Sequence, residues 1–395
     1  MLLLNADRAQ KVMDKYGIDV LIATKPENVA YVCDYMIPGH KFLGAQVYAI
    51  LPREFHNSSL ILPLGEVADI ICNKLTWIDD LKCYGTFYIE TSSKTSLRDW
   101  ERKLSIFMSN INPYDGVETL VRTLMDKKLT KSRIGFDEAG VTPSIFKKIR
   151  DSLPDADIIE AYDIFREIRM VKTAEEKKRI KESVNIAEKA IESTLETVRE
   201  NMTVEQLVKQ LSTAMIEQGA LPAYPSIGIS TENFVQNIPP TKKKLKQGDL
   251  IRFDVGCIYQ YYYSDIARMA VLGKPSEKQK KYYYAVLEGE MRAIEAVKPG
   301  VQTSDVFKIA VQTVKKAGIP HYKRHHVGHG IGIELYDHPL ITPFEGTLLE
   351  EGMVLNIECP YYEIGFGGVQ VEDCIIVTKE GYEMISKSER ELYQI

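Results

Sequence analysis

Acidic residues inside short apolar segments are the feature that most constrains this sequence. Four of them, Asp254, Asp265, Glu358 and Glu372, stand in the last third of the chain, within or beside segments of strand-forming residues. A carboxylate is costly to bury in such surroundings unless it is paired or binds a metal. A fold that buries these segments must therefore place the acids next to basic side chains or metal ions.

A glycine-rich motif adds a histidine to this set. His329 stands in Gly-His-Gly-Ile-Gly, where the glycines let the backbone approach a ligand closely or adopt positive φ. His325 lies four positions earlier, but the glycines disfavour the helix that a zinc-binding pair at this spacing needs. Four carboxylates and one imidazole suit two divalent ions such as Mn, Co, Zn or Fe. Such a pair activates a bridging water and polarises the bond that is cut.

The first pair of acids is predicted to lie on an antiparallel hairpin. Leu250–Val255 and Ile266–Val271 read as strands that flank a tyrosine-rich segment. The spacing of 11 positions between Asp254 and Asp265 predicts a turn centred at 259–260, with the two acids directly opposite each other. Two like charges repel there unless a cation lies between them. Taken alone, this hairpin is better explained as a solvated one with incidental acids.

The second pair repeats the arrangement. Val354–Glu358 and Val369–Val377 read as strands on either side of a glycine-rich turn, with Glu358 and Glu372 symmetric about Gly365. Two acid-bearing hairpins in one region weaken the reading of solvated hairpins, and favour a common site.

Length and composition limit the class of protein. A chain of 395 residues predicts two domains. Hydrophobic content of 45% and charged content of 27% are typical of a soluble globular protein. A net charge of −5 argues against a nucleic-acid partner. The six cysteines show no CxxC spacing, and no apolar run approaches the ~20 residues of a membrane helix. We therefore expect a cytoplasmic protein without a membrane segment.

The first 165 residues alternate helical and strand patterns, which indicates an α/β domain. The expected turn is Lys25–Asn28. The expected helices and strands are Ala6–Tyr16, Val20–Ala23, Val47–Pro52, Ser59–Pro63, Ile134–Asp137 and Pro143–Asp151.

A second domain is expected over residues 166–395, because the composition shifts at Glu167–Lys181. Thr173 is a plausible N-cap, with Glu176 as its capping-box partner, for a helix that runs to about Arg199. A second helix is expected to begin near Thr203.

These motifs, in this order, resemble the M24 metallopeptidase superfamily of creatinase, prolidase and methionine aminopeptidase, and most closely its Xaa-Pro dipeptidase and aminopeptidase P branch. The segments Asn28–Tyr31, Arg169–Glu176 and Pro240–Asp249 also match, so the resemblance covers most of the chain. It implies an α/β N-terminal domain over 1–165. Over 166–395 it implies an α+β pita-bread catalytic domain, an antiparallel sheet flanked by helices.

The resemblance also implies an activity. The five motif residues Asp254, Asp265, His329, Glu358 and Glu372 match the family's ligands for two divalent metal ions. The implied reaction is hydrolysis of Xaa-Pro peptide bonds by a metal-bridged hydroxide, with Glu358 as base and proton shuttle. The implied substrate is a small peptide or small amide, and the implied assembly is a homodimer.

Other positions depart from the family's pattern. His325 matches a histidine that contacts substrate, but Asn237 and Tyr336 stand where the peptidases carry histidines. Gln370 stands where the prolidase branch usually has arginine. Asn does not titrate, and Tyr titrates only near pH ~10, yet both can donate a hydrogen bond to a developing oxyanion. His325, Tyr336 and Asn237 are therefore candidate catalytic residues beside Glu358.

The departures leave a second activity open. The same fold and metals could act on a non-peptide small molecule, because the superfamily includes creatinase, ectoine hydrolase and a sulfonium lyase. A third alternative, a binding protein without catalysis, is disfavoured by the retention of five costly polar groups in the metal motifs.

Overall fold

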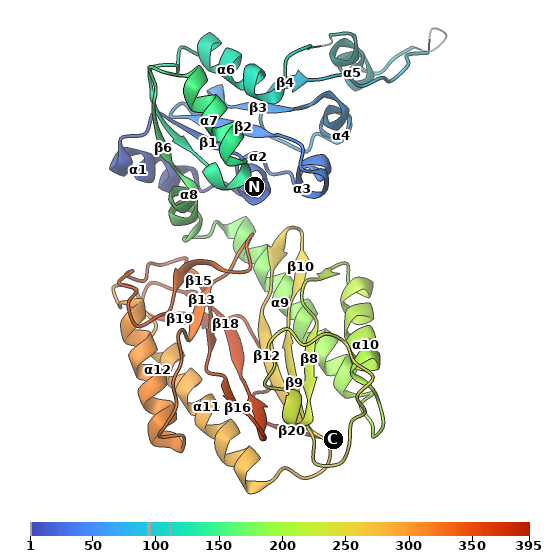
Figure 1. Ribbon diagram of the computed structural model, residues 1–395, viewed down its shortest axis with the longest axis vertical. Coiled ribbons are helices and arrows are strands. Elements are labelled where there is room, and N and C mark those ends of the chain that lie inside the picture. Colours follow the sequence, from blue (N-terminus) through green and yellow to red (C-terminus); the bar gives the residue numbers. More distant parts are fainter. Residues whose placement is uncertain (1, 93–95, 111) are drawn as a thin grey trace. The chain divides into compact units, whose positions relative to one another are not determined.

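The computed structural model describes residues 2–92, 96–110 and 112–395. It divides into two compact units, Met1–Arg169 and Met170–Ile395, which are drawn in Figure 1. The boundary expected after residue 165 falls inside the last helix of the first unit, α8 (Tyr162–Arg169). Among the described residues, no helix combines the length and the apolar composition that crossing a bilayer requires.

The first unit is built on a mixed six-stranded sheet with strand order β4-β3-β2-β1-β5-β6. Strand β1 pairs antiparallel with β2 and parallel with β5. Helices α6 and α7 pack on this sheet through a buried cluster that includes Leu120, Ile149 and Phe136. The α/β character expected for this part of the chain is therefore confirmed. Its strands are β1 (Val20–Ala23), β2 (Tyr48–Pro52), β3 (Ser59–Pro63), β4 (Asp80–Tyr84), β5 (Arg133–Phe136) and β6 (Asp157–Glu160). Its other helices are α1 (Ala6–Tyr16), α2 (Pro26–Cys33), α3 (Pro38–Leu43), α4 (Val67–Asn73), α5 (Asp99–Ser109), α6 (Gly116–Asp126) and α7 (Pro143–Ser152).

One expectation for this unit is wrong. The segment predicted as a turn, Lys25–Asn28, lies almost entirely in helix α2 instead. Pro26 stands in the first helical turn, where its missing N–H removes no helical hydrogen bond. The Asn28 side chain donates to Asp137 Oδ2 at 2.8 Å, so the polar residues that suggested a turn are satisfied from within the core.

The second unit holds a nine-stranded sheet, with the order β14-β13-β15-β18-β12-β9-β8 and with β19 and β20 attached to β18 and β12. Helices α11 and α12 lie side by side (Figure 1), and share a core with strands β12, β15 and β18. Helix α9 packs on β10, β11 and β12, and α10 packs on α9 and β8. The helices are α9 (Ala174–Leu195), α10 (Val204–Glu217), α11 (Glu277–Glu295) and α12 (Thr303–Ala317).

The strands of this unit are short and mostly antiparallel. In chain order they are β7 (Leu221–Pro222), β8 (Ser226–Ile229), β9 (Leu250–Val255), β10 (Cys257–Tyr259), β11 (Tyr262–Tyr263), β12 (Ile266–Val271), β13 (Gly328–Gly330), β14 (Asp337–Leu340), β15 (Val354–Glu358), β16 (Tyr361–Glu363), β17 (Gly367–Val369), β18 (Glu372–Val377), β19 (Tyr382–Met384) and β20 (Tyr393–Gln394). The alternation of side chains along β15 explains the placement of Glu358. Leu355 and Ile357 enter the core that α11 and α12 cover, so alternation turns Glu358 to the opposite face.

The start of α9 is as expected. The Thr173 amide donates to Glu176 at 2.8 Å, and the Glu176 amide donates to Thr173 Oγ1 at 3.2 Å, which completes the predicted capping box. The helix ends at Leu195, four positions before the expected Arg199.

Candidate metal centre

Five neighbouring strands of the second sheet each bring one predicted ligand to a common place. In sheet order the strands are β13, β15, β18, β12 and β9. Because adjacent strands lie about 4.8 Å apart, ligands that are distant in sequence become neighbours. Their positions, in the same order, are His329 within β13, Glu358 at the end of β15, Glu372 at the start of β18, Asp265 just before β12 and Asp254 within β9.

Three of the predicted ligands form the tightest group. Asp265, His329 and Glu372 each offer one ligand atom, and these atoms all lie within 4.8 Å of one another. His329 Nε2 is 3.5 Å from Asp265 Oδ2. Asp254 and Glu358 line the same cavity, which has a volume of about 480 Å³. Asp265 and Glu372 line this cavity as well, so the four acids surround one space, and His329 adjoins it through its contact with Asp265.

The strand registers agree with one sequence expectation and correct another. Glu358 pairs directly with Glu372, as the symmetry about Gly365 predicted. Asp254, however, lies opposite Ala267 and not opposite Asp265. The turn is made by residues 260–261, both at positive φ, so it is centred one position later than predicted. Asp265 is thereby shifted by two positions and reaches the site diagonally, still on the same face.

The acids are held where a negative charge is costly. Burial raises the pKa of Glu358 to about 7, opposed by Arg324 and His329. Burial also raises the pKa of Glu372 well above its ordinary value, and the charges of Asp265 and Glu358 raise it further. Like charges at such short range need a cation between them.

His329 is oriented as a ligand. Its Nδ1 donates to the carbonyl of Gly330 at 2.9 Å, which fixes the tautomer and leaves Nε2 free to accept. Nε2 and Asp265 Oδ1 are buried and have no hydrogen-bond partner. Buried polar atoms without partners are uncommon in proteins. Together with the clustered carboxylates, they fit divalent cations of the hard or borderline class.

Two amide side chains support the carboxylates. Asn356 Nδ2 donates to Glu372 Oε1 at 3.0 Å and to the Asp265 carbonyl at 2.6 Å. Gln370 Nε2 lies 3.4 Å from one oxygen of Glu358 and 3.4 Å from one oxygen of Glu372. Both amides donate to the acids, so they orient the ligands without adding charge.

Arg252 contacts the predicted site but was not predicted from the sequence. Its side chain is fully buried and donates to Asp254 Oδ2 at 2.6 Å, to Gln370 Oε1 at 2.8 Å and to the Val235 carbonyl at 2.7 Å. It therefore connects one predicted ligand, the amide that faces two others, and the loop that carries Asn237. Its position two residues before Asp254 on one strand could have revealed it, since alternate residues share a face.

The three candidate catalytic residues outside the ligand set, His325, Tyr336 and Asn237, all line the cavity. The Tyr336 ring stacks on the His329 ring, with the centroids 3.8 Å apart and the planes at 21°. Its side chain is 47% exposed, which leaves it accessible to a bound substrate. Asn237 lies in an exposed loop with φ of 51°.

Two further side chains near the acids were missed. His326, the neighbour of His325, places Nδ1 3.3 Å from Glu358 Oε1. Arg324 also lines the cavity. Both lie in a loop before β13, and a loop carries no periodicity that would assign one face to each residue.

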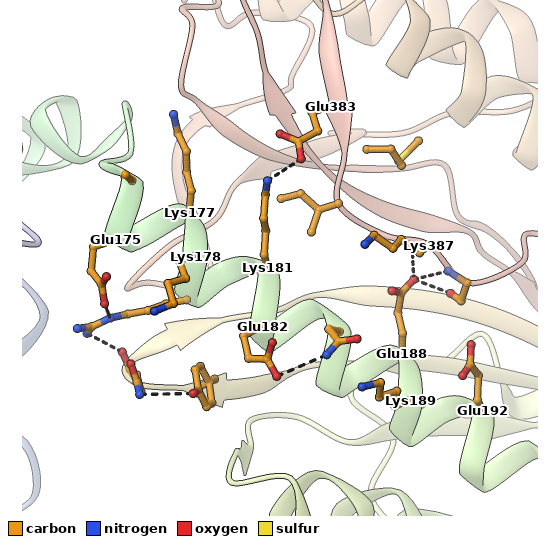
Figure 2. Close-up of a pocket in the computed structure, with 18 residues that line it drawn as sticks. Glu175, Lys177, Lys178, Lys181, Glu182, Glu188, Lys189, Glu192, Glu383 and Lys387 are labelled. Carbon is orange, nitrogen blue, oxygen red and sulfur yellow. Dashed lines mark hydrogen bonds and ion pairs between the residues drawn. The ribbon is translucent and has the colours of Figure 1, made fainter. Parts of the chain in front are cut away.

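A larger cavity of about 890 Å³ lies along α9, outside the metal centre (Figure 2). Its charges are largely compensated: Arg179 donates to Glu175 at 2.9 Å, and Lys181 pairs with Glu383. Glu188 accepts from the backbone amides of Lys387 and Ser388 at 2.7 Å each. The groove therefore offers paired surface charge and no obvious chemistry.

Comparison with known proteins identifies the family. The model of metallopeptidase family M24 matches residues 178–379, and that of the creatinase/prolidase N-terminal domain matches residues 87–171. An Xaa-Pro dipeptidase of Pyrococcus furiosus is 36% identical over 232 residues, which are 58% of this chain and 67% of that protein. An uncharacterised peptidase of Staphylococcus aureus is 26% identical over 393 residues, 97% of this chain and 99% of its own.

Solved structures agree. The prolidase from Pyrococcus horikoshii has a TM-score of 0.78 at 25% identity, covering 98% of this chain and 99% of its own. The Xaa-Pro dipeptidase from Bacillus anthracis has a TM-score of 0.82 at 24% identity, with 99% of both chains covered, and its likeness concerns the fold. These neighbours confirm the expected α/β domain followed by a pita-bread domain. The chain is a hydrolase, and it belongs to metallopeptidase family M24.

Proposed function

We propose that this chain is a dinuclear metal-dependent hydrolase of Xaa-Pro peptide bonds, of the Xaa-Pro dipeptidase class. The observation that carries the proposal is that four carboxylates line one cavity and that the imidazole of His329 lies with two of them, Asp265 and Glu372. The 36% identity to an Xaa-Pro dipeptidase of Pyrococcus furiosus supports the choice of substrate.

The roles follow from position. The five side chains Asp254, Asp265, His329, Glu358 and Glu372 would hold two divalent ions, Mn, Co, Zn or Fe. When bound, such ions activate water and polarise the scissile carbonyl. Glu358, which lies beside His326, takes the proton of the nucleophile and delivers it to the leaving amine.

Neutral donors complete the proposed mechanism. The Tyr336 hydroxyl and the Asn237 amide line the cavity and can each donate one hydrogen bond to the substrate carbonyl as it becomes an oxyanion. The Tyr336 ring covers His329, which shields that imidazole from water.

A substrate panel tests the proposal. It contains Gly-Pro, Met-Pro, an Xaa-Pro tripeptide, and creatine-like and ectoine-like amides, each assayed with Mn, Co, Zn and Fe after removal of bound metal. Cleavage of the Xaa-Pro peptides that depends on metal is expected. Full activity after exhaustive chelation would overturn the metal mechanism.

A second candidate keeps the fold and the metals but changes the substrate to a non-peptide small molecule. It is favoured by three neutral side chains, Asn237, Tyr336 and Gln370, which line the cavity where the peptidases carry cationic or titrating groups. In that case the wild type should cut only the creatine-like or ectoine-like amides. The variant Asn237→His with Tyr336→His should then gain cleavage of Xaa-Pro peptides.

A homodimer and a cytoplasmic location remain predictions from the sequence. Sedimentation at micromolar concentration tests the first of them. A single species of 44.9 kDa would contradict the dimer.

A further inference from the structure

His326 faces Glu358, the proposed base, from the loop before β13. Its Nδ1 lies 3.3 Å from Glu358 Oε1. This nitrogen is buried, and it makes no hydrogen bond with any of the described residues. The side chain lines the metal cavity and is only 14% exposed. Buried polar atoms without partners are uncommon in proteins, so the position of this one indicates a role in the site.

The backbone beside His326 holds the ring against Glu358. The amide of Val327, the next residue, donates to the carbonyl of Ile341 at 3.0 Å. The carbonyl of Val327 accepts from the amide of Glu358, also at 3.0 Å. The end of the loop is thus hydrogen-bonded on both sides, and one of its partners is the residue that His326 faces. The short approach of the imidazole to the carboxylate is therefore set by the sheet.

The surroundings of the ring keep it neutral. It packs edge-on against the rings of His325 and Tyr336, with centroids 4.3 Å and 6.1 Å away. Burial, together with the charge of Arg324 and the nearby histidines, lowers the pKa of the His326 imidazole to about 3. A neutral imidazole carries one N–H, and a carboxylate oxygen opposite Nδ1 favours the tautomer that has the proton there.

Glu358 is faced by a neutral donor at each of its oxygens. His326 Nδ1 lies beside Oε1, and Gln370 Nε2 lies 3.4 Å from Oε2. Donors at both oxygens fix the plane of a carboxylate. Neither donor brings a positive charge, which would oppose the arrival of a proton more strongly than a neutral N–H does. The pair is therefore suited to orient a carboxylate that must also accept a proton.

We propose that His326 is a positioning residue, whose Nδ1–H holds Oε1 of Glu358 in the orientation that metal binding and proton transfer require. The inference rests on the proposed function, in which Glu358 is both ligand and base. The contact of 3.3 Å is expected to shorten to an ordinary hydrogen bond once substrate is bound, as catalytic contacts often do. What matters is then a donor at the place of Nδ1, and not the ring itself.

Three substitutions of His326 separate the roles that it could have. His326→Asn puts an amide nitrogen where Nδ1 stands, since each of these atoms is bonded directly to Cγ. His326→Gln puts its amide nitrogen one bond farther out, nearer the place of Nε2. His326→Phe keeps a ring for packing but has no donor. The matched control is His56→Phe, which replaces an exposed histidine of the first unit.

Two measurements are made on each variant: steady-state kinetics with Met-Pro, and calorimetric titration of the metal-free protein with Mn²⁺. His326→Phe and His326→Gln should lose about tenfold to a hundredfold in kcat with KM nearly unchanged, because orientation of the base acts in the chemical step. Both should also bind Mn²⁺ about tenfold more weakly, as expected when the partner of a ligand is lost. His326→Asn should stay close to the wild type in both measurements, and His56→Phe should equal it.

The possible failures can be told apart. A fully active His326→Phe would show that the ring only packs. An active His326→Gln beside an inactive His326→Asn would move the role to Nε2, and would overturn the proposal. If circular dichroism shows that His326→Phe does not fold, the comparison of Asn with Gln decides alone. If the wild type does not cut Met-Pro, the proposed function fails. The Mn²⁺ affinities then decide the role of His326, and equal affinities in the wild type, His326→Asn and His326→Gln would overturn it.

Discussion

The groove along α9 and the metal cavity both contain many charged side chains. In the groove these are mostly paired and solvated, whereas in the cavity the acids are buried together. In the groove, four of the five acids have a partner within the groove (Figure 2), and most of the charged side chains are in contact with solvent. In the cavity, four acids lie close to one histidine. Asp265, Glu358 and Glu372 are each less than 10% exposed. The groove is the larger space, so size does not locate the chemistry. Buried charge that the protein does not itself compensate is the better guide.

The largest effect is expected when one acid of the metal cavity is removed. Glu372→Ala removes an acid at the centre of the cavity and should abolish hydrolysis, a loss of about a thousandfold or more, because bound metal contributes several kcal/mol. Metal content, measured by elemental analysis, should fall in parallel. The matched control is Glu383→Gln in the groove, which should leave both quantities unchanged. A Glu372→Ala enzyme with wild-type metal content and activity would contradict the site.

The next effect concerns a neutral donor. Tyr336→Phe removes one hydroxyl from the cavity and keeps the ring on His329. Loss of an oxyanion donor costs about 2.7–4 kcal/mol, so kcat on Xaa-Pro peptides should fall by about two to three decades. Metal content should not change. A variant as fast as the wild type would show that this hydroxyl has no part in the reaction.

A smaller effect is expected at Arg252, the cation behind the ligands. Arg252→Met removes the donors to Asp254 and Gln370. Removing an outer partner of a metal ligand typically weakens metal binding about 10- to 100-fold. Calorimetric titration of the metal-free protein with Mn²⁺ measures this, and Arg252→Lys should recover part of the affinity. Equal affinity in the wild type and in Arg252→Met would remove Arg252 from the metal centre.

The smallest effect is expected on stability, and it concerns Glu176 in α9. This helix lines the groove, but Glu176 in its first turn is fully buried, and burial raises the pKa of its carboxyl to about 7. An acid with a raised folded pKa contributes its full stability below the unfolded value near ~4.3, and loses it as the pH rises through 7. Glu176→Gln keeps an acceptor for the Thr173 amide but cannot ionise.

Denaturant unfolding at two pH values measures this effect. Between pH 5 and pH 6 the wild type should lose about 1 kcal/mol more of its unfolding free energy than Glu176→Gln. Parallel pH dependence of the two proteins would show that Glu176 is ionised in the folded state throughout this range.

The fold could be predicted where local chemistry decides it. The Thr173 capping box, the strands that bear the acids and the pairing of Glu358 with Glu372 all follow from spacing and composition. The helix α2 could not be predicted in this way, because its buried Asn28 is satisfied by a partner more than 100 positions away, Asp137. The first hairpin was misplaced by one position because its turn uses residues 260–261 at positive φ without glycine.

The candidate site was also predicted only in part. The structure places four of the five predicted ligands around one cavity and His329 against two of them, and their binding of metal stays a prediction. Arg252, Arg324 and His326 were missed because their importance depends on neighbours from other strands and loops. Arg324 and His326 lie in a loop, which has no periodicity, whereas Arg252 lies on β9 two positions before Asp254, where strand alternation could have revealed it.

One measurement tests the central claim most directly. The protein is stripped of metal, titrated with Mn²⁺, and followed for bound metal and for hydrolysis of Met-Pro in the same samples. The account predicts about two ions per chain and activity that rises with occupancy. It also predicts that the Glu372→Ala chain binds less metal and stays inactive, while the Glu383→Gln chain follows the wild type. Hydrolysis at the full rate without metal, or no metal bound at any concentration, would contradict it.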